Sequence, residues 1–321
     1  MKTAETATNR SALVKSAAIA SVVTALTLLI VKAWAAQASG SSAMLASFGD
    51  TVLDLVASAA TLFAVRYAAQ PADAEHRFGH GKAEALAAIV QVMLVTVAAT
   101  AIAGSSILEL SSGTPVTSPE PAVAASLIAI GVTLALVAWQ GFVVRRTGSV
   151  AIKADSLHYR ADLLLNGAVI VALAAQSLLG VAWIDPLFGL AIAAWLGYGA
   201  WQAGGEAIDH LLDREWDNEQ RAKLIAIVAQ HKGVSNLHDL RTRTSGTIDF
   251  AQFHIDMPGH LTVGHSHAII DAIEHDLAQA FPGSDIIIHV DPEGHVDEPG
   301  NPLREADEFD NVDYSLIQRR A

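Results

Sequence analysis

Residues 83–110 have the sequence AEALAAIVQVMLVTVAATAIAGSSILEL, an almost uninterrupted apolar run whose ionisable residues are Glu84 and Glu109. A helix needs roughly 20 such residues to cross the hydrocarbon core of a bilayer. The stretch therefore predicts a membrane-spanning helix, and the rest of the chain can be compared with it.

Five more stretches are long and apolar enough to span: 12–36, 43–68, 122–144, 150–179 and 184–211. The chain is 52% hydrophobic and only 17% charged, which is too apolar for a soluble protein of 321 residues. The first stretch is too long for a signal peptide and lacks a small-residue cleavage pattern. The predicted fold is an all-α, six-helix transmembrane bundle.

Lysine and arginine gather at the N-terminus, in the second and fourth connectors and after the last span: Lys2, Arg10, Lys15, Arg66, Arg77, Lys82, Arg145, Arg146, Lys153 and Arg214. The other three connectors carry none, and Lys32, near the outer end of the first span, can snorkel. Positive loops face the cytoplasm, so both termini are expected there.

Charge density rises after Asp213, which indicates a soluble C-terminal domain. Its periodicity predicts, in order, a helix, two strands turning at Ser245-Gly246, a second helix and a third strand: 217–231, 237–244, 248–257, 263–281 and 285–290. This α-β-β-α-β order predicts a small α+β, metallochaperone-like sandwich.

Four regions are therefore expected along the chain. They are a cytoplasmic N-terminal segment, a six-span transport domain, a cytoplasmic metal-binding dimerisation domain and an acidic disordered tail: 1–11, 12–212, 213–292 and 293–321. The net charge is −13 and no basic stripe is present, so nucleic acid is not an expected partner. There are no cysteines, so any metal must be bound by histidine and carboxylate.

Two pairs of ionisable residues stand inside apolar helices. Asp50 and Asp54 lie in the second span, and His158 and Asp162 lie in the fifth. Residues four apart share one helix face, so each span offers two ligands to one neighbour. Polar residues can also hold helices together, but three carboxylates without a cation would repel one another. The pattern predicts a four-coordinate divalent metal site within the membrane.

Such a site suggests its own coupling to protons. Metal ligands must be deprotonated, so protons and metal compete for them. The imidazole of His158 titrates nearest physiological pH. Metal–proton antiport by alternating access at a single site is the resulting hypothesis.

A second candidate site lies in the connector before the third span. Asp73, His76 and His80 have spacings of three and four residues, and the flanking glycines allow His80 to turn back toward the other two. A surface metal site and a solvated loop are both compatible with this spacing.

The third candidate site uses the histidines of the C-terminal domain. His238, His254, His267, His289 and Asp291 could hold two zinc ions, with the carboxylate bridging them. Unrelated surface histidines are the alternative. His265 could take the place of His267.

Several strings carry a family resemblance. They are MLAS at 44–47, HRFGHGKAE at 76–84, ADSLH at 154–158, LLDR at 211–214, HDLRTR at 238–243 and IHVDP at 288–292. With them, the chain resembles the cation diffusion facilitator family, and within it the bacterial zinc transporters, over about residues 11–291. The resemblance implies a multi-pass protein of a bacterial inner (plasma) membrane.

The resemblance also implies roles for individual residues. Asp50, Asp54, His158 and Asp162 would form a zinc-type transport site, and the other two sets would bind zinc with a structural or regulatory role. A homodimer in the lipid bilayer is implied, with Lys82 and Asp213 as a charge pair at its interface. Val290 stands where relatives carry a polar residue, and no role is implied for the acidic tail.

Other functions were weighed against antiport. An intramembrane metalloenzyme is disfavoured because no His-Glu-x-x-His motif occurs, so the chain is not expected to be an enzyme. A channel needs weaker or multiple sites than a closed four-ligand site. A membrane zinc sensor stays open as an alternative, as does cadmium, iron, cobalt or manganese as the main substrate.

Overall fold

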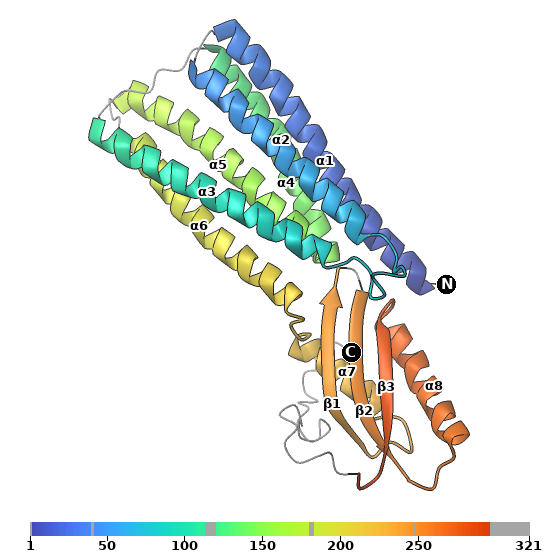
Figure 1. Ribbon diagram of the computed structural model, residues 1–321. Coiled ribbons are helices and arrows are strands. Elements are labelled where there is room, and N and C mark those ends of the chain that lie inside the picture. The colour runs from blue at the N-terminus through green and yellow to red at the C-terminus, as the bar shows by residue number, and fades with distance from the viewer. Residues whose placement is uncertain (1, 40–41, 113–119, 180–182, 247, 296–321) are drawn as a thin grey trace. The chain divides into compact units, whose positions relative to one another are not determined.

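The computed structural model describes residues 2–39, 42–112, 120–179, 183–246 and 248–295 (Figure 1). The chain divides into two compact units: one is Arg10–Leu211, and the other comprises the residues from Leu212 onward together with those before Arg10. Six long helices come first: α1 (Lys2–Ser39), α2 (Ser42–Ala68), α3 (Ala83–Ser112), α4 (Glu120–Thr147), α5 (Val150–Leu179) and α6 (Ile184–Leu211).

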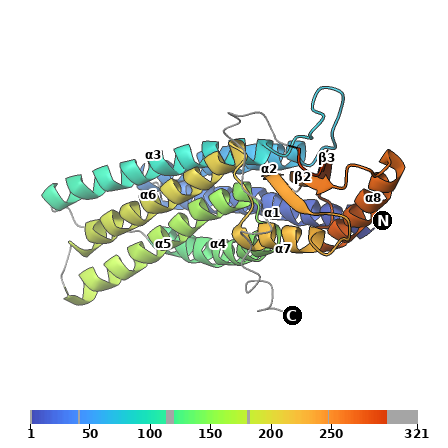
Figure 2. The ribbon, with the colours of Figure 1, turned by 90° about the horizontal axis from the view of Figure 1, so that it is seen from below.

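The six helices pack as a bundle. α3 packs most extensively against α6, and the two run side by side in both views (Figure 1, Figure 2). α5 contacts α2, α3, α4 and α6. One buried cluster joins α1 to α2, α4 and α5 through Val14, Ala17, Val65, Val143 and Ile152.

Small residues on α6 permit close helix packing. A side chain at Gly189 would collide with Ser106 of α3, and one at Gly199 would lie 2.7 Å from Leu157 of α5. Helices in membranes depend on such small residues because lipid provides little hydrophobic force between them.

Within the described residues, four helices are long and apolar enough to cross a membrane: Asn9–Ala38, Phe48–Ala68, Ala83–Leu110 and Ala124–Thr147. The first half of α5 is less apolar because it carries Lys153, Asp155, Arg160 and Asp162. The predicted helices of the bundle are present, and spanning by α5 and α6 stays a prediction.

The segment before the first predicted span is helical. α1 begins at Lys2, and the cytoplasmic location of residues 1–11 stays a prediction. No glycine or proline occurs between Lys2 and Ala12 to end the helix.

The second unit contains α7 (Asn218–Val228), β1 (Asn236–Ser245), β2 (Ile248–Met257), α8 (Val263–Ala280) and β3 (Asp285–Pro292). β1 and β2 are antiparallel, whereas β2 and β3 are parallel and joined through α8. β3 is longer than predicted because Asp291 and Pro292 pair with Asp256 and Met257 of β2. α7 begins at its cap Asp217, whose side chain accepts a 2.8 Å hydrogen bond from Gln220 N, and it ends before the predicted residue 231.

One face of the sheet packs on the two helices around a core that includes Leu224, Phe253, Ile273 and Leu277. β1 departs from strict alternation, because a register shift follows His238 and Asp239 takes a φ of 52°. Most of the predicted acidic tail, 296–321, lies outside the described residues.

Candidate metal centres

Three of the four ionisable residues inside the bundle come together. His158 Nε2 on α5 lies 2.9 Å from Asp54 Oδ1 on α2 and 3.6 Å from Asp162 Oδ2. One ligand atom from each residue lies within 4.8 Å of the other two. The three side chains are 15–27% exposed, so the group is shielded while still open to an arriving ion.

These distances suit tetrahedral coordination of a metal ion. With zinc–ligand bonds of about 2.1 Å, the ligand atoms of a tetrahedral site lie roughly 3.4 Å apart. The separations of 2.9 and 3.6 Å from His158 bracket that value. An ion could therefore enter with small adjustments of the side chains.

Asp50 is not within this close group. It is exposed and lies one turn before Asp54 on α2. Its carboxylate is nonetheless near enough to act electrostatically on Asp162. Its role as the fourth ligand stays a prediction.

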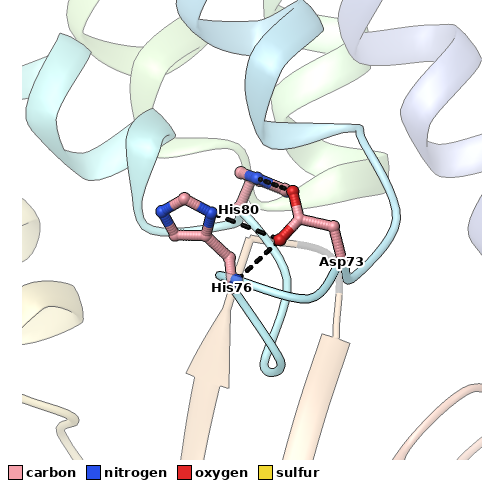
Figure 3. A group of neighbouring side chains, drawn as sticks. All are labelled: Asp73, His76 and His80. Atoms are coloured by element: carbon pink, nitrogen blue, oxygen red, sulfur yellow. Dashed lines mark hydrogen bonds and ion pairs between the residues drawn. The ribbon is translucent and has the colours of Figure 1, made fainter.

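The connector residues form a compact group (Figure 3). His76 Nδ1 lies 3.4 Å from Asp73 Oδ1, and His80 Nε2 lies 3.3 Å from Asp73 Oδ2. Gly79 has a φ of 79°, a left-handed conformation that lets the chain bring His80 back toward Asp73. His80 is buried and meets Tyr67 edge-on at 4.6 Å between ring centroids.

Backbone hydrogen bonds favour the ionised form of Asp73, which is the form that could bind a cation. The amides of His76 and Glu75 donate to its Oδ1 at 2.6 and 2.9 Å. The bond from His76 is the main reason that the pKa of Asp73 is lowered from its ordinary value. These bonds therefore stabilise the folded protein fully above the ordinary pKa of an aspartate. That stabilisation is lost as the pH falls through the lowered pKa of Asp73.

A His80→Ala variant should lose one bound divalent ion from the purified protein, because two ligands cannot hold the ion that three can. Metal analysis after equilibration with zinc would measure the loss. His260→Ala, which removes an exposed histidine outside all three groups, is the matched control. An unchanged metal content in His80→Ala would show that the connector is a solvated loop without a metal.

The third group is built by strand register. His238 of β1 stands opposite His254 of β2, which stands opposite His289 of β3. The ring centroid of His254 lies 5.3 Å from that of His238 and 4.5 Å from that of His289. Three neighbouring strands thus bring three imidazoles into one row.

Asp291 lies two residues after His289 on β3, and its carboxylate contacts all three imidazoles of this row. Its Oδ2 lies 2.8 Å from His254 Nδ1 and 3.6 Å from His238 Nε2, and its Oδ1 lies 3.4 Å from His289 Nε2. Both oxygens of one buried carboxylate therefore face imidazoles. That arrangement suits a carboxylate that bridges two metal ions.

Neither candidate on α8 lies in this group. His267 is exposed and paired with Asp271 at 3.0 Å, and His265 contacts Thr262 at 3.3 Å near the helix start. The expected interface charges have other contacts as well: Lys82 donates to Leu211 O at 3.1 Å, and Asp213 lies 3.5 Å from Arg243. The roles of His267, Lys82 and Asp213 remain predictions.

Asp155 was not among the predicted site residues. It lies three residues before His158 and is fully buried in α5. Its signal was available, because an ionisable residue in an apolar helix is itself a mark of function. It was counted only within the ADSLH string.

Comparison with known proteins decides the family. A protein-family model described as the cation efflux transmembrane domain matches residues 18–212, which is more than half of the chain. The chain belongs to the cation efflux family. A second model, described as the cytoplasmic domain of cation efflux proteins, matches residues 216–293. The resemblance to cation diffusion facilitators is thereby confirmed.

Two relatives and one solved structure are similar to this chain. The cation-efflux pump FieF of Yersinia enterocolitica is 45% identical over 280 residues, covering 87% of this chain and 93% of that protein. FieF of Citrobacter koseri is 43% identical over 285 residues with the same coverage. The metal-bound C-terminal domain of the CzcD transporter from Thermotoga maritima is 26% identical, covering 26% of this chain and 99% of that chain with a TM-score of 0.24.

Membership of the cation efflux family confirms the coarse predictions. The protein is a multi-pass membrane transporter of divalent metal ions, with a helical membrane region followed by a cytoplasmic α+β domain, and it is not an enzyme.

Proposed function

We propose that this cation efflux protein exports zinc in exchange for protons, at a site formed by Asp50, Asp54, His158 and Asp162. The main support for the proposal is the contact between α2 and α5 at His158. Its Nε2 lies 2.9 Å from the carboxylate of Asp54 and 3.6 Å from that of Asp162. An uncompensated charge at the centre of a membrane helix costs about 2.5–3.5 kcal/mol on insertion scales. A divalent ion offsets that cost for several carboxylates together.

Proton exchange follows from the ligand chemistry. The same atoms bind either metal or protons, since a carboxylate or imidazole must be deprotonated to coordinate. When the site faces the side richer in protons, protons displace the metal. When it faces the cytoplasm, metal displaces the protons.

Zinc is favoured by the donor set. Imidazole nitrogen and carboxylate oxygen are both ligands that zinc binds, whereas all-oxygen sites suit manganese or magnesium better. Cadmium, iron and cobalt can use the same donors, so one of these as the main substrate is the second candidate.

The cytoplasmic groups complete the proposal. We infer a homodimer with both termini in the cytoplasm of a bacterium and six membrane spans per chain. Zinc at the connector and at the binuclear group would stabilise the dimer, with Lys82 and Asp213 at its interface. The positions of lysine and arginine support this orientation.

Purified protein in vesicles tests the antiport. With a zinc-sensitive dye inside, an acidic interior should drive zinc uptake, and the interior pH should rise as zinc enters. Dissipating the pH gradient with a proton carrier should reduce the uptake. Flux that ignores the gradient would indicate a channel, and binding without flux would indicate a sensor; either result would contradict the proposal.

A further inference from the structure

Asp155 is a carboxyl group inside the bundle that is separate from the four proposed metal ligands. It lies on α5, one turn before His158, and has 0% exposure. A buried ionisable group in a membrane helix is energetically costly and is therefore a candidate functional residue.

Two side chains from other helices bind one oxygen of this carboxyl. Ser21 Oγ of α1 donates to Asp155 Oδ2 at 2.6 Å, and Gln140 Nε2 of α4 donates to the same atom at 2.8 Å. Gln140 Nε2 also lies 3.0 Å from Ser21 Oγ. The other carboxyl oxygen, Asp155 Oδ1, is buried and has no hydrogen-bond partner in the described part of the chain, and the same holds for Gln140 Oε1.

Ser21 has two acceptors for one hydrogen. Its Oγ lies 2.6 Å from Asp155 Oδ2 and 3.1 Å from the carbonyl oxygen of Ala17, one turn earlier on α1. A hydroxyl group has a single donor hydrogen but two lone pairs. Ser21 can therefore donate to only one of these acceptors at a time.

Because Ser21 can donate to either acceptor, Asp155 has hydrogen-bond partners both when it is ionised and when it is protonated. When Asp155 is ionised, Ser21 and Gln140 both donate to it. When Asp155 carries a proton, its own O–H can donate to Ser21 Oγ, and Ser21 can turn its hydrogen to Ala17. The NH₂ of Gln140 lies 3.0 Å from Ser21 Oγ and can donate to the second lone pair of that hydroxyl. Ser21, Gln140 and Asp155 therefore each have an acceptor for their donor hydrogens in both protonation states.

The network is next to the transport site without being part of it. The charged groups that act electrostatically on Asp155 are His158, on the same helix, and Asp54 of α2. From α1 and α4 it is faced by the neutral Ser21 and Gln140. The charge on the transport site therefore bears directly on whether Asp155 holds a proton.

The contacts of Tyr159 extend the network to α2. The buried Tyr159 hydroxyl donates to Ser21 O at 3.1 Å and shares a 2.8 Å hydrogen bond with Ser58 of α2. α2 also carries Asp54. Tyr159 thus ties the backbone of α1 at Ser21 to the helix that holds a proposed metal ligand.

We propose that Asp155 is a proton-binding site coupled to the transport site, taking up a proton from water when metal leaves and releasing it when metal binds. In the uptake step a hydronium ion loses one O–H bond and becomes water while the carboxylate gains one O–H bond; release is the reverse, and no other reactant is needed. The inference rests on the proposed antiport, to which it adds a proton carried apart from the metal ligands.

The test counts protons. Zinc is added to full-length protein in weak buffer containing a pH dye, in a background with Asp73→Ala and Asp291→Ala so that the other groups contribute fewer protons. Adding Asp155→Asn should leave zinc binding in place and lower the number of protons released per zinc. Ser21→Ala, which keeps the carboxyl and removes one donor, is the matched control and should still release them.

The outcomes separate the two proposals. Unchanged proton release in Asp155→Asn would overturn the role of Asp155 while leaving antiport intact. Absence of proton release and of gradient-driven flux in the protein with Asp155 would overturn the antiport itself. If Asp155→Asn does not fold, infrared difference spectra of metal-free and zinc-bound protein decide. A protonated-carboxyl band that Ser21→Ala leaves unshifted would rule out Asp155 as its source.

Discussion

Replacing Asp54 with alanine is expected to abolish zinc transport in vesicles. Asp54 supplies the carboxylate oxygen nearest to His158, at 2.9 Å, and through this contact α2 meets α5 at the proposed site. Loss of a supporting residue around a metal lowers affinity by about 10–100-fold, so loss of a direct ligand should lower it by more. Zinc uptake into dye-loaded vesicles and zinc titration of the purified protein would measure both effects.

A control separates this effect from general damage to the bundle. Glu206→Gln removes another carboxylate of the membrane region, one paired with Lys153 outside the proposed site, and should transport zinc normally. Both variants should elute as folded protein. Full transport by Asp54→Ala would remove the basis for the proposed site.

Replacing Asp291 with alanine is expected to empty the binuclear group of the cytoplasmic domain. One carboxylate contacts His238, His254 and His289, and no other described side chain contacts all three. Without it, three imidazoles would have to hold two ions. Metal analysis of purified protein should show a loss of cytoplasmic zinc, larger than that caused by removing any one histidine.

Thermal unfolding provides a second measurement. A ligand that binds the folded state stabilises it by about 2.7 kcal/mol at a concentration of 100 times its Kd. Added zinc should therefore raise the Tm of the cytoplasmic transition in the parent protein more than in Asp291→Ala. Asp276→Asn, which alters a carboxylate paired with His231 in the same domain, should respond like the parent. An equal rise in all three proteins would contradict the assignment.

Local patterns predicted most of the fold. The apolar runs give the six helices, and strand alternation with its turn residues gives the order of the C-terminal domain. The exceptions lie at ends of elements. α7 stops at Val228, before the predicted residue 231. β3 continues to Pro292 because pairing with β2, rather than local preference, decides where this strand ends.

The sites were predictable to the extent that they are local. Asp73, His76 and His80 are close in sequence, and the i, i+4 spacing places His158 and Asp162 on one face. His267 depends on how α8 is rotated against the sheet, which its own periodicity does not encode. The Asp155 network was missed for a related reason, since its partners come from α1 and α4 and meet only when the bundle is packed.

The register of His238, His254 and His289 has a consequence for the cytoplasmic domain as a whole. Hydrogen-bonded strands lie about 4.8 Å apart, so backbone pairing sets the intervals between these donors before any ion arrives. β1 and β3 are the two edges of the sheet, and an ion held across the row would clamp both edges to the middle strand. Metal content would then follow the folded fraction of the domain, and a weakened core far from any histidine would be detected as lost metal.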